Sequence, residues 1–247
     1  MNKVDARLST QNPAQNPAQN PAQNPAQNLA RRPTRVKICG FTRPADAQIA
    51  SDLGVDAIGL VFYPPSPRHV SIEQAVEIAQ TVSPFCTVTA LFLNAEINHV
   101  DDVLRSVPVS LLQFHGTESA QYCESFARPY IKSVAMKSVD DVSAYCDQFA
   151  SCRGFLLDSN AAGAAGGSGT VFDWSLVPAE LASSLILAGG LDVDNVTEAI
   201  REIRPAAVDV SSGVESAKGV KDQQMMREFI NNVRAADAYR SVPPAAG

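Results

Sequence analysis

Short apolar runs alternate, along most of the chain, with segments whose apolar residues recur at helical spacing. The apolar runs predict eight strands, at residues 35–39, 56–62, 86–93, 110–114, 130–136, 153–158, 184–188 and 206–210. Between them, apolar residues at i, i+3, i+4 and i+7 predict helices with one buried stripe, and clear examples begin at Ala75, Val100, Val196 and Met226. Strands rich in Val, Ile and Leu with helices between them are typical of parallel pairing through right-handed crossovers.

The number and size of these units favour one architecture. Eight units over residues 35–247 average about 27 residues each, close to the size of one βα repeat, so we expect an α/β fold, a single-domain (β/α)8 TIM barrel. The alternative is a doubly wound open sheet, which usually carries a GxGxxG turn after its first strand. Here the first strand ends in Cys39-Gly40-Phe41-Thr42, which does not fit that motif.

Residues at the predicted helix ends support this division. Pro44 suits the first turn of a helix, and Gly54 suits the C-terminal cap of the same helix. Asp192 or Asp194 can cap the start of the seventh helix.

The N-terminal residues 1–34 differ from the rest in composition. From Gln11 to Ala26 the sequence QNPA is repeated four times. Proline at every fourth position blocks helix and sheet, and Asn and Gln offer nothing apolar to bury, so we expect residues 1–34 to be a disordered low-complexity tail. A spacer without a specific role is the simpler interpretation, and a role in assembly is the alternative. We expect residues 35–247 to form the barrel and to carry any catalytic site.

Charge and hydropathy exclude several classes of partner. The 247 residues include 20 Lys and Arg against 26 Asp and Glu, a formal net charge of −6. Binding of nucleic acid needs a surplus of Lys and Arg, so we expect no nucleic-acid partner. The apolar runs are shorter than the ~18 residues that span a bilayer, and residues 1–30 lack the apolar core of a secretory signal, so we expect no membrane partner and no export.

The cysteines indicate a reducing environment. There are five, at positions 39, 86, 123, 146 and 152, with no CxxC pair and no Cys/His cluster at zinc spacing. We therefore expect free thiols, a cytoplasmic location and no metal site.

In a barrel of this kind, polar residues at the carboxyl ends of the strands form the active site. The first strand ends on Cys39, and alternation places Lys37 on the same face, toward the barrel interior. A nearby cation lowers the pKa of a thiol, so a thiolate at neutral pH is one interpretation, and a small apolar filler is the other. A buried Lys37 needs a partner, for which Asp209 on the eighth strand is our candidate.

Two further charged residues follow predicted strands. Asp158 ends the sixth strand and precedes the glycine-rich loop 159–169, which we interpret as a lid whose closure desolvates the carboxyl group and lets it act as an acid. The simpler alternative is that Asp158 caps the loop backbone. Arg68 follows three prolines in residues 64–67, so its guanidinium is held ready for a carboxylate or phosphate, unless it is only a solvated loop residue. His115 remains unassigned.

Glycine-rich turns follow the last two strands. Gly189 and Gly190 follow the seventh strand, and Ser212 and Gly213 follow the eighth. Glycines let an anion approach the backbone, and a short helix at this place would donate N–H groups, so together these turns predict a phosphate site. Either turn alone is more simply a tight turn.

The motifs resemble one enzyme family, phosphoribosylanthranilate isomerase of tryptophan biosynthesis. The resemblance covers about residues 36–233 and rests on VKICGFTR, GLVFYPPSPR, LQFHG, LLD, GGSGTVFDW, LAGGL and VDVSSGVE. It implies an isomerase that converts N-(5-phosphoribosyl)anthranilate into 1-(2-carboxyphenylamino)-1-deoxyribulose 5-phosphate by an Amadori rearrangement. The phosphorylated small molecule would be its ligand, no cofactor is needed, and we expect a monomer or homodimer.

The resemblance also assigns roles to the candidate residues. It implies Cys39 as general base, Asp158 as general acid and Arg68 as ligand of the anthranilate carboxylate. It assigns the phosphate to Gly189, Gly190, Ser212 and Gly213, and we place Asp209 with the substrate-binding residues. One departure is that Gly169 is followed by Thr170 where the family often has a basic residue. A related aminoaldose isomerase of histidine biosynthesis, which uses a carboxylate base, and a catalytically silent barrel are the alternatives.

Overall fold

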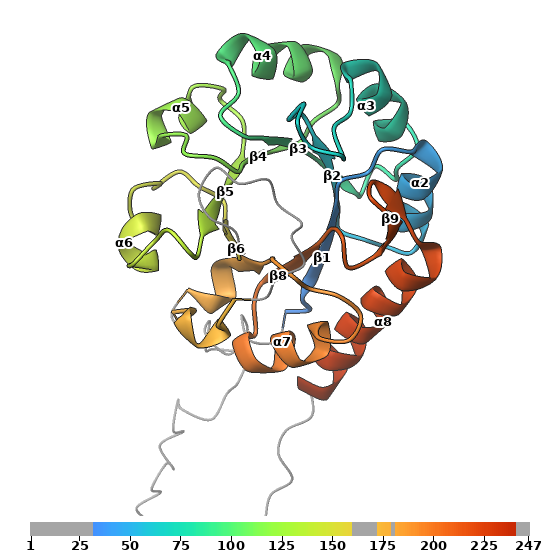
Figure 1. The fold of residues 1–247 in the computed structure, drawn as a ribbon, viewed down its shortest axis with the longest axis vertical. Coiled ribbons are helices and arrows are strands. Elements are labelled where there is room, and N and C mark those ends of the chain that lie inside the picture. Colours follow the sequence, from blue (N-terminus) through green and yellow to red (C-terminus); the bar gives the residue numbers. More distant parts are fainter. Residues whose placement is uncertain (1–31, 160–171, 179–180, 241–247) are drawn as a thin grey trace, which may run out of the picture.

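The chain folds into a closed barrel of eight parallel strands in sequence order (Figure 1). This computed structural model describes residues 32–159, 172–178 and 181–240. The strands are β1 (Arg35–Cys39), β2 (Ala57–Val61), β3 (Thr87–Phe92), β4 (Leu111–Phe114), β5 (Tyr130–Ala135), β6 (Phe155–Asp158), β7 (Leu185–Leu187) and β8 (Ala207–Val210). Each lies within two residues of its predicted bounds, and pairing of β1 with β8 closes the sheet. The predicted barrel is therefore confirmed over the open sheet.

Helices surround the barrel on the outside (Figure 1). They are α2 (Pro44–Asp52), α3 (Ile72–Ala79), α4 (Ile97–Ser106), α5 (Ala120–Glu124), α6 (Val142–Cys146), α7 (Val196–Ile203) and α8 (Gln223–Arg240). Between β6 and β7 the described residues form two 3-10 helices, η3 (Trp174–Leu176) and η4 (Ala182–Ser184). The predicted lid, apart from Ser159, lies outside the described residues.

The helix ends follow the expected signals in part. Helix α2 starts at Pro44, and Gly54, with φ +81°, reverses the chain directly after it. The predicted cap of α7 is wrong, because the N-cap residue is Asn195. Asp192 instead accepts hydrogen bonds from the backbone N–H groups of Asp194 and Asn195, which closes the turn before the helix.

The apolar core lies between the sheet and the helices. Outward-facing strand residues such as Ile38, Ile58 and Phe92 are fully buried there, together with stripe residues such as Ile200 and Phe229. Burying each such side chain contributes about 1.5–3 kcal/mol, and this layer is the main source of stability. The inward-facing positions are more polar, because successive side chains of a strand alternate between the two faces.

A hairpin, not a short helix, follows β8. Residues 211–222 are all described and contain β9 (Glu215–Ala217) and β10 (Val220–Lys221), joined by a turn at Gly219 with φ +78°. The predicted short helix is therefore wrong, because the chain here pairs with itself and folds over α2 (Figure 1).

The predicted tail lies mostly outside the described residues, so its disorder stays a prediction. Its last residue, Thr34, is buried, and both its backbone N–H and its hydroxyl donate to the carboxylate of Asp237 in α8. Within the described part of the chain, no helix is long and apolar enough to cross a membrane.

Candidate active site

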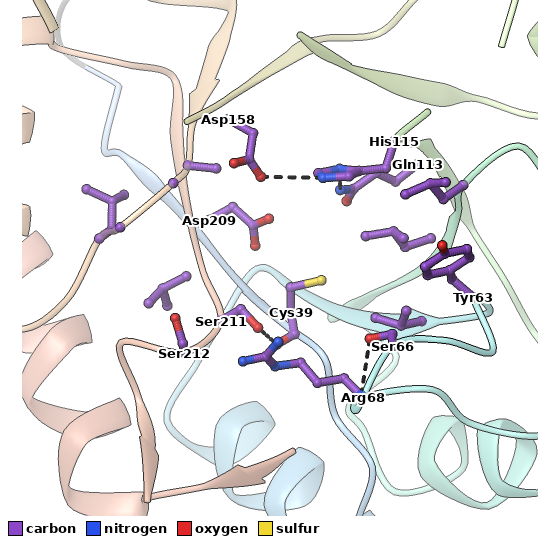
Figure 2. A pocket seen from close by; sticks show the side chains of 18 residues that line it. Cys39, Tyr63, Ser66, Arg68, Gln113, His115, Asp158, Asp209, Ser211 and Ser212 are labelled. Carbon is purple, nitrogen blue, oxygen red and sulfur yellow. Dashed lines mark hydrogen bonds and ion pairs between the residues drawn. The ribbon is translucent and has the colours of Figure 1, made fainter. Parts of the chain in front are cut away.

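A pocket opens at the carboxyl ends of the strands and holds about 690 Å³ of empty space, including the part open to solvent. Of the predicted site residues, Cys39, Arg68, Asp158, Gly189, Gly190, Asp209 and Ser212 line it. Gly213 follows Ser212 without lining the pocket. Strands β1, β6, β7 and β8 and the loop after β2 thus bring the predicted residues together (Figure 2).

A buried ion pair lies beside Cys39, as predicted. The ammonium group of Lys37 is 2.9 Å from Oδ2 of Asp209, and both side chains are buried. The two residues are direct neighbours in the pairing of β1 with β8. Burial lowers the pKa of Lys37, but the charge and the hydrogen bond of Asp209, together with a contribution from Cys39, more than offset this, so the net shift is upward and the ammonium stays charged. The other oxygen, Oδ1 of Asp209, has no partner among the described residues.

The pKa of Cys39 differs from the expectation. Burial of the thiol raises its pKa, and the opposing charges of Lys37 and Lys221 do not offset this shift. The carboxylate of Asp209, which pairs with Lys37, raises the pKa of the thiol further. Burial therefore disfavours the thiolate in this pocket, opposite to the expected lowering of the pKa.

Glycine at position 59 makes room for this thiol. Gly59 in β2 is the direct neighbour of Cys39 in β1, and a Cβ atom there would be 2.6 Å from Sγ. Any larger residue would displace the sulfur. Gly59 was not among the predicted site residues, although alternation along β2 places it on the inner face.

Asp158 ends β6 and points into the pocket opposite Cys39 (Figure 2). Its Oδ2 is 3.4 Å from Nε2 of His115, the residue left unassigned above. The other ring nitrogen, Nδ1, lies 2.5 Å from the hydroxyl of Ser133 and 3.3 Å from the amide nitrogen of Gln113. These contacts fix the ring plane of His115, so the imidazole holds the carboxyl group of Asp158 in position.

Arg68 is buried in the pocket wall, so the solvated-loop alternative is wrong. Its Nε and Nη2 donate to the two carboxylate oxygens of Glu215, each at 2.8 Å. Its backbone N–H donates to Ser66. Glycine is required at position 40, where φ is +82° and a Cβ atom would be 2.4 Å from Cδ of Arg68.

The glycine turns lie next to one another at the ends of β6, β7 and β8. Gly189 and Gly190 have φ of +78° and +72°, and a Cβ atom on Gly189 would be 2.5 Å from the backbone nitrogen of Ser159. A Cβ atom on Gly213 would be 2.0 Å from the carbonyl oxygen of Leu191. Close packing of the loops thus already requires glycine at positions 189 and 213. The absence of side chains at these glycines would also leave backbone N–H groups accessible to an anion.

Glu215 and Lys221 are the functional candidates that the sequence analysis missed. Both belong to the hairpin β9–β10, and neither residue lies at the carboxyl end of a barrel strand, where polar site residues are expected. The motif VDVSSGVE includes Glu215, which was a usable signal. Among the described residues no group of three or more His, Cys, Asp or Glu side chains could hold a metal ion.

Comparison with known sequences identifies relatives of this barrel. The family model of N-(5'phosphoribosyl)anthranilate (PRA) isomerase matches residues 36–232. The N-(5'-phosphoribosyl)anthranilate isomerase of Pseudomonas putida (strain GB-1) is 51% identical over 202 residues, which are 82% of this chain and 98% of the relative. The enzyme of the same name from Leptothrix cholodnii is 48% identical over 214 residues, 87% of this chain and 96% of the relative.

Solved structures agree with the sequence relatives. Phosphoribosyl anthranilate isomerase from Thermotoga maritima superposes with a TM-score of 0.73 at 38% identity, covering 82% of this chain and 99% of that one. A phosphoribosyl anthranilate isomerase in complex with reduced 1-(o-carboxyphenylamino)-1-deoxyribulose 5-phosphate has a TM-score of 0.71 at 36% identity, with the same coverage. The resemblance noted from the motifs is thereby confirmed, and the chain belongs to the N-(5'-phosphoribosyl)anthranilate isomerase family.

Proposed function

We propose that this barrel isomerises N-(5-phosphoribosyl)anthranilate to 1-(2-carboxyphenylamino)-1-deoxyribulose 5-phosphate, in tryptophan biosynthesis, with Cys39 as base and Asp158 as acid. The observation that carries the proposal is the placement of a thiol and a carboxyl group opposite each other in one pocket (Figure 2). An Amadori rearrangement needs one group that gives a proton and one that takes a proton, on opposite sides of the substrate.

The steps use these two groups in turn. Asp158, protonated at the start, gives its proton to the ring oxygen of the ribose, the bond from C1 to that oxygen breaks, and an iminium forms between C1 and the anthranilate nitrogen. The Cys39 thiolate then takes the proton from C2, and the electron pair of the C–H bond moves into the new C1–C2 double bond, neutralising the nitrogen. The resulting enolamine tautomerises to the ketone.

The raised pKa of Cys39 fits this order of events. Burial disfavours the thiolate in the free pocket, where Asp209 neutralises Lys37. The iminium places a positive charge near the sulfur, and an opposite charge lowers the pKa of a thiol. We therefore propose that ring opening precedes and promotes the loss of the thiol proton, which passes to solvent water at the open mouth of the pocket before the thiolate takes the proton from C2.

Three other parts of the pocket would bind the substrate. Arg68 carries the positive charge that suits the anthranilate carboxylate. The backbone at Gly189, Gly190, Ser212 and Gly213 would bind the phosphate. Asp209 lines the pocket, and its Oδ1, which is buried and has no partner among the described residues, would accept a hydrogen bond from the substrate.

The cellular setting and assembly follow as further parts of the proposal. All five cysteines are free thiols, which suits the reducing cytoplasm. One solved relative from Thermotoga maritima is described as dimeric, and we propose a monomer or a homodimer for this chain. The mass of the purified protein in solution, with and without residues 1–31, distinguishes these states and tests a role of the tail in assembly.

The test is the loss of phosphoribosylanthranilate fluorescence on adding the purified full-length protein without added metal. We expect rapid loss with the wild type and a loss slowed at least about 100-fold with Asp158→Asn, since general acid catalysis contributes about 10²- to 10⁴-fold. If the folded wild type leaves the fluorescence unchanged but consumes the aminoaldose substrate of the histidine pathway, the proposed reaction is wrong. If it consumes neither, the barrel is a binding protein.

A further inference from the structure

Arg68 does not stand alone in the pocket wall. Two of its nitrogens, Nε and Nη2, donate side-on to both oxygens of Glu215, and the two side chains are only 8% and 4% exposed. A bidentate pair of this kind fixes the plane of the guanidinium and not only its distance. Glu215 therefore decides which edge of Arg68 is turned toward the pocket.

Glu215 is fixed in turn by Lys221 in the same hairpin. The ammonium nitrogen of Lys221 is 2.7 Å from Oε1 of Glu215, 2.6 Å from the carbonyl oxygen of Cys39 and 3.1 Å from that of Ser211. Three acceptors satisfy the three N–H groups of a protonated lysine. Lys221 thus connects the hairpin to the ends of β1 and β8, next to the proposed base.

The rest of the guanidinium is available to a ligand. Arg68 lines the pocket and Glu215 does not, so the carboxylate lies behind the arginine. Within the described residues Nη1 of Arg68 has no hydrogen-bond partner. Figure 2 shows the guanidinium beside Ser211 and below Cys39, and a Cβ atom on Gly40 would contact both Arg68 and Ser211. The unused edge of Arg68 therefore belongs to the pocket.

The charges of this cluster do not balance. Burial lowers the pKa of Lys221, but its three oxygen acceptors favour the ammonium form. With Lys221 charged, Arg68 and Lys221 carry two positive charges and Glu215 carries one negative charge. The neighbouring carboxylate of Asp46, which accepts from the backbone N–H of Lys221, is already paired with Arg43. A buried excess charge is unfavourable until a counter-ion arrives. One ligand carboxylate would complete the cluster.

We propose that Glu215 and Lys221 are positioning residues that turn Arg68 toward the substrate and make the pocket selective for an aromatic amine that bears a carboxylate. This inference rests on the function proposed above. It assigns a role to the hairpin β9–β10: the hairpin holds the specificity group of the pocket in place. Neither residue touches the reacting atoms.

Glu215→Gln separates orientation from charge. The amide keeps the size of the side chain but turns an N–H₂ group toward the donors of Arg68, so the guanidinium loses its fixed plane. The same change raises the charge of the cluster from +1 to +2, which alone would strengthen the binding of an anion. The two effects have opposite signs, so the direction of the measured change identifies the one that matters.

The experiment compares kcat/KM for N-(5-phosphoribosyl)anthranilate with kcat/KM for N-(5-phosphoribosyl)aniline, which lacks the carboxylate. We expect Glu215→Gln to lower the ratio of the two values at least about 10-fold, the effect of losing one charge-assisted hydrogen bond, because only the carboxylated substrate uses Arg68. The matched control is Glu118→Gln, which makes the same change in the buried Lys132–Glu118 pair. We expect any loss in that variant to be equal for both substrates.

Other results would overturn the inference. If the ratio of the two kcat/KM values stays constant or rises in Glu215→Gln, the charge of the cluster, and not the orientation of the guanidinium, determines how Arg68 binds the carboxylate. If the wild type has equal kcat/KM for the two substrates, Arg68 does not make the pocket selective for the carboxylate. If Glu215→Gln does not fold, Glu215→Asp keeps the charge but shortens the reach, and an unchanged ratio there contradicts positioning. Failure of the wild type on both substrates refutes the proposed function itself, which is a separate outcome.

Discussion

The described residues include two buried Lys–Glu pairs, Lys132 of β5 with Glu118 and Lys221 of β10 with Glu215, and their surroundings differ. In the first, Lys132 and Glu118 are 3.2 Å apart, and their other partners are backbone groups: the carbonyls of Phe114 and Gly116, and the N–H groups of Asn94 and Gly116. In the second, Lys221 also binds backbone carbonyls, but Glu215 binds the side chain of Arg68.

The difference shows that the same pair of residues can serve two purposes. Lys132 and Glu118 form hydrogen bonds with backbone carbonyl and N–H groups of the loops after β3 and β4, and these bonds stabilise the two loops. Glu215, itself held by Lys221, fixes the orientation of Arg68, whose side chain lines the pocket. The residue types of a buried ion pair thus do not reveal its role. The role follows from the other groups that the glutamate binds, which are backbone N–H groups for Glu118 and a pocket side chain for Glu215.

The largest effect on stability is expected at the first pair. Glu118→Gln leaves the fully buried ammonium of Lys132 without a counter-charge and opposes N–H donors with an amide N–H₂ group, so we expect the free energy of unfolding to fall by about 3 kcal/mol. Urea unfolding measures this value. A change below about 1 kcal/mol would show that the loops do not depend on the pair and would end the comparison.

A smaller effect on stability, and one that depends on pH, is expected at the second pair, Lys221 and Glu215. Burial alone would raise the pKa of Glu215, but the hydrogen bond from Arg68 and the charge of Lys221 hold it below its ordinary value of 4.5. A lowered pKa contributes stability that is present above the unfolded value and is lost as the pH falls through the folded value. The gap in unfolding free energy between wild type and Glu215→Gln should therefore be full at pH 7 and shrink below about pH 4.5. A gap that grows on acidification would contradict the assigned sign.

The smallest effect is expected at an ion pair on the surface. Arg35 and Asp56 lie 2.6 Å apart, but the side chain of Arg35 is 70% exposed. Arg35→Ala should change the free energy of unfolding by less than about 1 kcal/mol, because exposed pairs gain little in water. Thermal unfolding beside Glu118→Gln measures this contrast. Equal losses in the two variants would mean that burial does not distinguish these pairs.

Much of the fold was predictable from the sequence because its cause is local. Eight apolar runs at regular spacing predicted the strands, and alternation together with closure of the barrel predicted the contact between Lys37 and Asp209. The segment between β6 and β7 shows no apolar stripe, and its described residues form only 3-10 helices.

The features that were wrong or missed depend on three-dimensional surroundings. Burial is the largest cause of the raised pKa of Cys39, and the degree of burial does not follow from the charged residues near Cys39 in the sequence. The role of Glu215 depends on a hairpin that brings it to Arg68, 147 positions away in the sequence. The short helix expected directly after β8 is replaced by that hairpin, whose anchor points, Thr42 and Asp46, lie in another βα unit.

The assignment of Cys39 as the base is tested most directly by the turnover of phosphoribosylanthranilate in Cys39→Ser beside Cys86→Ser, a second buried thiol that does not line the pocket. A hydroxyl is a far weaker base near neutral pH, so Cys39→Ser should keep the fold, judged by circular dichroism, and lose at least about 100-fold in kcat. Cys86→Ser should stay within a few-fold of the wild type. Equal losses in the two folded variants, or full activity in Cys39→Ser, would contradict the assignment.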